Sequence, residues 1–135
     1  MRGDNDPRAR LQTIHELAGR IDARREDLAE AGAADAGFPV KVTLLETDIS
    51  VRHLRSMEEE SDWVADGRPY GMVAAIFPYD APIVMMSRLG GAALLTGNRL
   101  RFSFSSWTPR SARLIADISK PFSAFEPVVG QDNRE

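Results

Sequence analysis

The first stretch of the chain carries apolar residues at the intervals of an amphipathic helix. One apolar stripe, with polar residues mostly off it, is formed by Leu11, Ile14, Leu17, Ala18 and Ile21. Asp6 and Pro7 precede this stripe, and the pair is typical of a helix N-cap followed by proline at the first helical position. The pattern therefore predicts a helix that begins at Pro7 and packs through one face.

Two further helices are expected before the loop at residues 66–69. Residues 25–36 predict a short helix, and Gly37 is placed to end it. A longer helix is expected from about Pro39 to Ala65. Its apolar residues fall on two neighbouring tracks, one formed by Val42, Leu45 and Ile49 and the other by Leu44, Val51 and Leu54. These tracks predict that the third helix is packed.

Strands and helices alternate in the second half of the chain. Residues 71–77 form a continuous apolar run that is too short for a free-standing buried helix and fits a strand covered on both faces. Ile83 to Thr96 predicts a buried helix that ends at Gly97 and Asn98. The later elements are a strand at residues 100–104, a helix from Pro109 to Ile118 with Thr108 as N-cap, and a strand at residues 125–129.

This order of elements predicts an α/β fold. N-terminal helices are followed by strands that alternate with helices, and such alternation favours a parallel sheet with crossover connections. Residues 1–66 form the helical segment and residues 67–135 the sheet unit, and together they are expected to make a single structural domain. Ligands of open parallel sheets gather beyond the carboxyl ends of the strands. The loops expected at that end are residues 78–82 and 103–109.

Composition narrows the possible functions. The 135 residues are 43% hydrophobic and 27% charged, as in a soluble globular protein, and the net charge of -3 lacks the basic excess expected of a nucleic-acid binder. No apolar run approaches the roughly 20 residues of a membrane-spanning helix, and Met1 to Arg10 contains no secretory hydrophobic region. Neither nucleic acid nor membrane is therefore expected as a partner, and a cytoplasmic location is the default.

The absence of cysteine excludes disulfides, thiolate metal sites and a cysteine nucleophile within these residues. The histidines are His15 and His53 only, and Glu58–Glu60 is typical of a solvated face. No metal site is predicted.

A family resemblance is carried by the segments around the two loops. The run GMVAAIFPYDAP at residues 71–82 resembles the aldehyde dehydrogenase stretch G-V-V-A-A-I-x-P-W-N-x-P. Residues 92–98 are similar to the family's A-x-A-L-x-x-G-N, and Ser105 and Pro109 stand where the family has K-P-S-x-x-x-P. Because several fixed offsets agree at once, the chain resembles the N-terminal part of the aldehyde dehydrogenase superfamily.

The resemblance implies a partial Rossmann-like βαβα unit of the family's cofactor-binding domain at residues 67–135. It implies NAD or NADP as cofactor, and oxidation of an aldehyde to an acid through a thioester on a cysteine, with a glutamate activating the water. A thiolate is a strong nucleophile, and the oxyanion that it generates needs hydrogen-bond donors aimed at it.

Asp80 stands at the catalytic position of the family's asparagine, whose side-chain amide donates to that oxyanion. An ionised carboxylate cannot donate, and the loss of one such donor typically costs about 3–4 kcal/mol. Asp80 would serve only if burial kept it protonated. The alternative is a loop carboxylate that caps the helix beginning near Pro82.

The resemblance also identifies cofactor-binding positions. Ser103 stands where the family's lysine reaches the adenosine ribose or a 2′-phosphate, and Arg101, on the same strand face, would supply a charge in its place. Tyr79 replaces the family's tryptophan. The remaining positions on the cofactor side are Ile76, Phe77, Pro78 and Ser105, with core packing as the alternative for the first two.

Family members are several times longer than this chain, and their cysteine and base glutamate lie beyond the matched region. We therefore expect a truncated aldehyde dehydrogenase-like oxidoreductase fragment, a pseudoenzyme that is inactive as an isolated chain. The alternatives are a non-catalytic interaction or regulatory module and one half of a split enzyme. An unpaired sheet edge favours a partner, either a complementary C-terminal aldehyde dehydrogenase polypeptide or a second copy of the chain.

Overall fold

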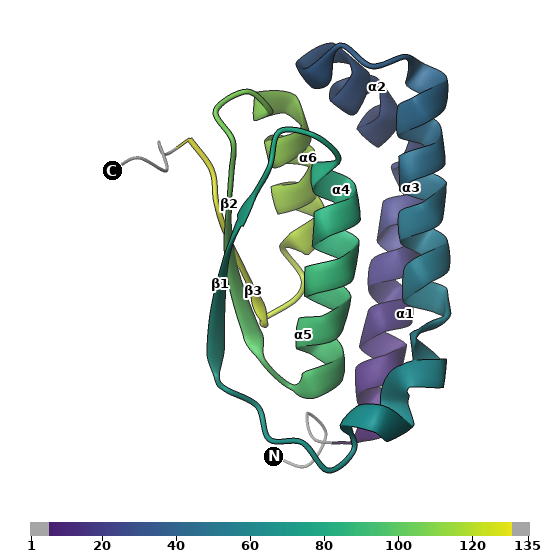
Figure 1. Cartoon of the computed structure of the whole chain (residues 1–135), viewed down its shortest axis with the longest axis vertical. Helices are drawn as coiled ribbons and strands as arrows, with labels where there is room; N and C mark the ends of the chain where they lie inside the picture. Colours follow the sequence, from purple (N-terminus) through teal and green to yellow (C-terminus); the bar gives the residue numbers. More distant parts are fainter. Residues whose placement is uncertain (1–5, 131–135) are drawn as a thin grey trace.

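The computed structural model describes residues 6–130, and residues 1–5 and 131–135 of the two predicted segments lie outside the described residues. The first half consists of α1 (Pro7–Ala23), α2 (Arg25–Ala36), α3 (Val40–Arg55) and the 3₁₀ helix η2 (Met57–Val64). The second half consists of β1 (Met72–Phe77), α4 (Pro82–Met85), the π-helical turn η3 (Met86–Gly90), α5 (Gly91–Thr96), β2 (Arg99–Phe104), α6 (Pro109–Ser119) and β3 (Phe125–Val128). Figure 1 shows the helices standing beside the sheet.

The sheet has the order β1-β2-β3, and β2 is parallel to both of its neighbours. Pairing of β1 with β2 runs from Met72 opposite Arg99 to Phe77 opposite Phe104. All three carboxyl ends therefore lie at one edge of the sheet. The predicted α/β fold, with helices first and a parallel sheet after them, is confirmed.

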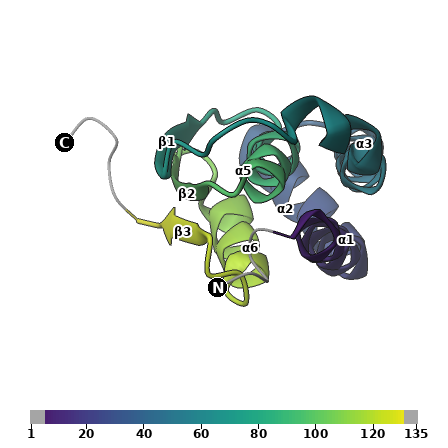
Figure 2. The same ribbon diagram turned by 90° about the horizontal axis from the view of Figure 1, so that it is seen from below.

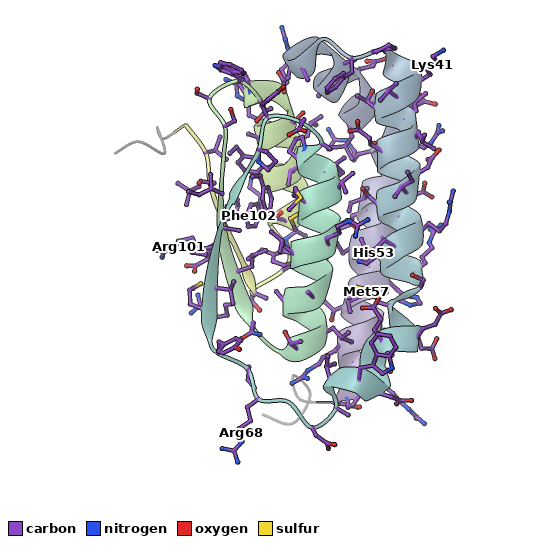
Figure 3. All side chains as sticks on the ribbon, in the orientation of Figure 1. Lys41, His53, Met57, Arg68, Arg101 and Phe102 are labelled. Carbon is purple, nitrogen blue, oxygen red and sulfur yellow. The ribbon has the colours of Figure 1, made fainter. Side chains whose placement is uncertain are left out.

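The helices lie on one side of the sheet, which Figure 2 shows from below. Along β2, buried residues alternate with more exposed ones, because successive side chains of a strand point to opposite faces. Phe102 points toward the helices and Arg101 points away from them (Figure 3). The sheet thus has a packed inner face and an uncovered outer face.

The prediction that residues 71–77 are covered on both faces is wrong for this chain. On the outer face of β1, Met72 is 42% exposed and Ile76 is 68% exposed. A continuous apolar run does not by itself say whether one or both faces of a strand are covered, and here the described helices all lie on one side of the sheet.

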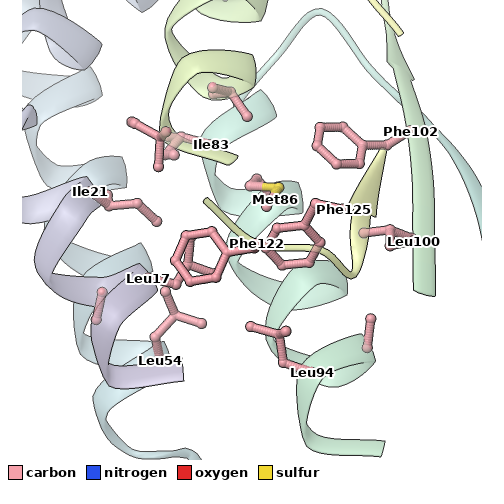
Figure 4. Close-up of a cluster of buried hydrophobic side chains, with 14 of the residues drawn as sticks. Leu17, Ile21, Leu54, Ile83, Met86, Leu94, Leu100, Phe102, Phe122 and Phe125 are labelled. Carbon is pink, nitrogen blue, oxygen red and sulfur yellow. The ribbon is translucent and has the colours of Figure 1, made fainter. Parts of the chain in front are cut away.

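The core lies between the sheet and the helices and draws on both predicted segments. Figure 4 shows part of it, made of Leu17, Ile21 and Leu54 from the first segment and Ile83, Met86, Leu94, Leu100, Phe102, Phe122 and Phe125 from the second. Phe102 is fully buried and stacks on Phe77 with ring centroids 5.1 Å apart. Each such side chain contributes about 1.5–3 kcal/mol through burial, so the helices and the sheet stabilise one another.

The predicted ends of the first two helices are confirmed. The Asp6 side chain caps α1 by accepting a hydrogen bond from the backbone N–H of Arg8 at 3.0 Å. Gly37 ends α2 with a φ of 79°, a left-handed conformation that glycine adopts without steric cost. Within residues 6–130, none of the helices combines the length and the apolar character required to span a bilayer.

The predicted continuous helix over residues 39–65 is wrong in its second half. α3 ends at Arg55, and the 3₁₀ helix η2 follows. The turn between them buries Met57, whose sulfur packs against Gly91 of α5. The acidic run that follows Met57, at residues 58–60, stays largely solvated.

Only the second of the two apolar tracks predicted for α3 is packed, since Val51 and Leu54 are buried and Leu44 is half-buried. The first predicted track is largely exposed, at 37% for Val42, 56% for Leu45 and 37% for Ile49. The buried face consists of Thr43, Thr47, Ser50, Val51 and Leu54. Two hydrogen bonds join this face to neighbouring helices, since Thr43 Oγ1 donates to the carbonyl of Ala29 at 2.7 Å and Ser87 Oγ donates to that of Ser50 at 2.8 Å. The hydroxyls of Thr47 and Ser50 donate to carbonyls within α3. Short side chains allow α3 to approach α2 and η3 closely enough for the two bonds between helices.

Candidate functional site

The loops that follow β1 and β2 lie side by side at the carboxyl edge of the sheet. In Figure 1 both lie at the upper end of the molecule. The ring of Tyr79 meets the ring of Trp107 at an interplanar angle of 62°, with centroids 5.4 Å apart. The two loops predicted to gather ligands are therefore in direct contact.

The loop after β1 contains a strained residue. Ala81 has a φ of 54° and a ψ of 49°, and it is the one residue other than glycine with positive φ within residues 6–130. This left-handed conformation costs about 1–2 kcal/mol for a residue with a Cβ. The carbonyl of Ala81 accepts hydrogen bonds from the backbone N–H groups of Val84 and Met85, so the start of α4 holds the turn in place.

Asp80 does not cap α4, and that alternative is wrong. Ala81 is the N-cap residue, and no side chain accepts a hydrogen bond from the first turn. Asp80 is exposed, so the burial on which a donor role depends is absent. The left-handed turn at Ala81 carries the chain into the helix without a carboxylate cap.

A second carboxylate lies near Asp80. Burial raises the pKa of Glu46 above its usual value, and the charge of Asp80 raises this pKa further. Glu46 on α3 lines a cavity of about 10 Å³ behind the loop, together with Tyr79 and Pro82. This space holds about one water molecule, so it cannot admit a cofactor.

The turn between β2 and α6 is closed by its own hydrogen bonds. Thr108 occupies the predicted N-cap position of α6, but its side chain does not cap the helix. Its hydroxyl donates to the carbonyl of Ser105 at 3.1 Å instead. Ser105 Oγ accepts from the backbone N–H of Trp107 at 3.2 Å. Ser105, a predicted cofactor residue, therefore shapes the turn itself.

The start of α6 is capped from a distant part of the chain. Asp35, near the end of α2, accepts hydrogen bonds from the backbone N–H groups of Arg110 at 3.3 Å and Ser111 at 2.8 Å. Its side chain is 1% exposed. Sequence reasoning missed this residue because the cap spans 75 positions, whereas capping patterns are local.

The predicted cofactor residues on the strands divide between the two faces. Ile76 is largely exposed on the outer face. Arg101 lies on that face with its side chain 59% exposed and forms an ion pair with Glu126 at 3.7 Å, and Arg99 joins the same carboxylate at 3.4 Å. Ser103 follows Arg101 by one strand period and is partly buried.

The ring of Phe77, in contrast, lies in the core. It is 1% exposed and is stacked between the sheet and the helices, so core packing describes it and not Ile76. Pro78 and Tyr79, which follow it, are exposed. Of the predicted run from Ile76 to Tyr79, the structure thus leaves three side chains accessible at the carboxyl edge.

A larger depression, of about 620 Å³, lies at the opposite edge of the sheet. Its lining comes from the start of α1, the end of α5, the start of β2 and the connection before β3, and includes Arg10, Glu16, Asn98, Arg99 and Ser123. Leu94, Gly97 and Asn98 of the family-like segment at residues 92–98 also line it, although none of the predicted site residues does.

The chain is thus an α/β protein whose candidate site lies beyond the carboxyl ends of parallel strands. The chain belongs to the aldehyde dehydrogenase family, which its residues 3–129 match. N-succinylglutamate 5-semialdehyde dehydrogenase of Klebsiella pneumoniae is 30% identical to it over 125 residues, which cover 82% of this chain and 25% of that enzyme. The NADP/NAD-dependent aldehyde dehydrogenase PuuC of Escherichia coli is 29% identical over 138 residues, 88% of this chain and 28% of that enzyme. The chain thus spans about a quarter of the length of these relatives.

Solved structures share the fold. Succinate-semialdehyde dehydrogenase from Burkholderia pseudomallei superposes with a TM-score of 0.83 at 23% identity, over 96% of this chain and 30% of that one. PnpE in complex with nicotinamide adenine dinucleotide superposes with a TM-score of 0.76 at 24% identity, over 90% of this chain and 29% of that one. The helices and parallel sheet described here are therefore those of the family.

The two loops suit a dinucleotide only in part. Accessible apolar and aromatic groups that a nucleoside could lie against are Ile76, Pro78, Tyr79 and Trp107. The acidic groups disfavour a diphosphate, because Glu46 and Asp80 lie at the loop and Asp35 already occupies the start of α6, where a helix would otherwise attract phosphate. The exposed guanidinium of Arg110 beside Asp35 is a cation that could offset them in part. The apolar groups of the two loops therefore suit a dinucleotide better than the charged groups of the loops do.

Proposed function

We propose that the chain provides the first part of an NAD(P)-dependent aldehyde dehydrogenase, and that these residues alone do not oxidise aldehydes. The match over residues 3–129 carries the first statement. Composition supports the second, because the family's thioester route needs a thiolate and these 135 residues contain no cysteine. Taken alone, the chain would be a pseudoenzyme.

Asp80 supports the same proposal. It places an exposed carboxylate where the resemblance expects an amide donor, and it lies close enough to Glu46 to raise the pKa of that residue. An acidic pair at this point repels a developing oxyanion and stabilises none of its charge. The loop therefore keeps the sequence motif that carries the resemblance but has a negative charge where the resemblance implies a hydrogen-bond donor.

The direct test of activity uses the purified chain with succinate semialdehyde, the aldehyde named by the rice and Burkholderia relatives, and either NAD or NADP. The readout is absorbance of the reduced nicotinamide, and E. coli PuuC serves as the positive control. We expect no turnover by the chain. Turnover that co-purifies with the chain through a second column would overturn the proposal.

Cofactor binding can be measured separately through tryptophan fluorescence. Trp107 lies at the candidate site, whereas Trp63 on η2 is 85% exposed and is not among its residues. Single-tryptophan variants, Trp63→Phe and Trp107→Phe, separate the two signals. We expect no saturable change in Trp107 emission with NAD or NADP. Saturable binding seen by Trp107 alone would contradict the claim that the site is incomplete.

The uncovered outer face of the sheet favours a second candidate, a chain completed by another polypeptide. Met72 and Ile76 expose apolar side chains beside the ion-paired Arg101, and β1 and β3 are both edge strands in the described sheet. Apolar groups on a sheet face and unpaired strand edges both attract protein partners. The partner would supply the cysteine and the glutamate.

Mixing the chain with the remainder of E. coli PuuC tests this candidate. Complementation predicts a stable complex in size-exclusion chromatography and aldehyde oxidation by the mixture. Ile76→Asp should abolish both, whereas Gln12→Asp on the exposed side of α1 should leave both unchanged. A complex without activity would support an interaction module instead, and the absence of any complex would count against both readings.

A further inference from the structure

We propose that Asp35 is a positioning residue for the candidate cofactor loop, acting through the start of α6. The carboxylate comes from α2, yet it completes the first turn of a helix in the other half of the chain. The proposal depends on the proposed function only in assigning the Ser105–Thr108 turn to the cofactor side.

The first backbone N–H groups of a helix lack acceptors within the helix. At α6, Asp35 supplies one carboxylate oxygen to Arg110 and the other to Ser111. The side chain is 1% exposed, so water does not replace it, and the Arg110 guanidinium lies 3.9 Å from the carboxylate. A buried carboxylate at a helix N-terminus is stabilised by the helix dipole as well as by these bonds.

Thr108, the residue directly before α6, would ordinarily cap this helix but makes a different hydrogen bond. Thr108 is in the N-cap position and is buried, but its hydroxyl bonds back to Ser105 and closes the turn. The turn can adopt that shape because Asp35 satisfies the helix in place of Thr108. The first turn of α6 is thus capped by Asp35 of α2 and not by Thr108, the residue that precedes the helix.

A chain of contacts leads from this cap to the site. Asp35 fixes the start of α6, and the turn immediately before α6 carries Trp107, whose ring rests against Tyr79 of the neighbouring loop. Movement of the α6 start would shift both aromatic rings relative to the sheet. Asp35 therefore controls the geometry of the apolar surface that a nucleoside would meet.

The test compares Asp35→Ala and Asp35→Asn with Glu30→Ala, a control on an exposed position of the same helix. Each protein carries 5-fluorotryptophan, so that ¹⁹F NMR reports Trp107 and Trp63 separately, with each resonance assigned from the single-tryptophan variants. Amide exchange at Arg110 and Ser111 reports the cap. Formate is added as a replacement for the carboxylate that alanine lacks.

We expect Asp35→Ala to shift the Trp107 resonance, leave that of Trp63 in place, and speed exchange at both amides about tenfold. Formate should restore both signals, which a general loss of stability would not allow. Glu30→Ala should change neither signal. If Asp35→Ala does not fold, Asp35→Asn, which keeps a single acceptor oxygen, should speed exchange at one of the two amides only.

An unchanged Trp107 resonance in folded Asp35→Ala would overturn the proposal. So would equal shifts of both tryptophans, absence of formate rescue, or unchanged exchange at both amides in Asp35→Asn. None of these measurements involves a dinucleotide. A failure of cofactor binding, which would concern the proposed function, is therefore separate from a failure of this proposal.

Discussion

The two faces of the sheet differ in how complete they are. On the inner face, aromatic rings from all three strands interlock, with Phe102 in contact with Phe77, Phe104 and Phe125. On the outer face, Ile76 stands exposed and the arginines of β2 share one carboxylate, Glu126. One Glu126 oxygen, Oε2, is shielded from solvent yet has no hydrogen-bond partner among residues 6–130.

The difference shows which contacts the chain can satisfy by itself. Its helices complete the packing on one side and supply no layer on the other. The helices likewise have a packed and an unpacked side, since α3 buries Thr43 and Thr47 but exposes the apolar Leu45. The chain spans about a quarter of the length of the relatives that it matches.

The largest expected effect contrasts the two faces directly. Phe102→Ala removes a fully buried ring and should cost about 3–5 kcal/mol of unfolding free energy. Ile76→Ala removes an exposed side chain and should change it by less than about 0.5 kcal/mol. Urea denaturation followed by circular dichroism measures both. Comparable losses at the two positions would mean that the outer face is covered in solution.

Two glycines, one on α5 and one on α1, test the same contrast between packed and uncovered positions on the helices. A Cβ on Gly91 of α5 would lie 2.5 Å from the sulfur of Met57 and 2.9 Å from Leu54 Cδ2, so Gly91→Ala should destabilise the fold by about 1–3 kcal/mol. A Cβ on Gly19 of α1 meets nothing within 4 Å. Gly19→Ala should stabilise the chain by about 0.5–1 kcal/mol through helix propensity. Melting temperatures that move in the same direction for both variants would contradict this contrast.

The smallest expected effect concerns pH. The pKa of Glu46 is raised in the folded chain by burial and by Asp80, above the ordinary value of 4.5. Ionised Glu46 therefore destabilises the fold above the raised pKa, and this cost disappears as the pH falls toward 4.5. Glu46→Gln should melt higher than the original chain near neutral pH and equally below 4.5.

Asp80→Asn provides the matched test of the cause. Since Asp80 contributes less to the raised pKa than burial does, this variant should recover only part of the difference. Melting temperatures recorded across the same pH range measure both variants. A gain from Glu46→Gln that is independent of pH would show that packing, and not ionisation, sets the cost.

The local features of the fold were predictable where their signals lie close together in the sequence. Asp6 with Pro7 and the glycine at position 37 mark helix ends through bonds and angles of a few adjacent residues. The buried face of α3 was not predictable in this way. Its second apolar track is buried at Val51 and Leu54, but the rest of the buried face consists of short polar residues such as Thr43, which bonds to Ala29, and not of the first apolar track.

The candidate site, too, was predictable from the sequence only in part. Its two loops, and the residues that carry the family resemblance, follow from motif and strand order, because parallel strands bring their carboxyl ends together. The choice between core and cofactor side for Ile76 and Phe77, which the sequence left open, the effect of Asp80 on Glu46 and the capping of α6 by Asp35 do not.

By itself, then, the sequence determined the order of the elements, the parallel sheet, the family and the lack of a thiol nucleophile. The sequence also indicated the buried face of α1, but only the tertiary structure decided which face of α3 is buried and which distant carboxylate reaches the start of α6. The physical reason is the sequence distance over which each interaction acts. Backbone propensity and capping act over a few residues, whereas burial and electrostatic coupling depend on neighbours that folding brings from far along the chain.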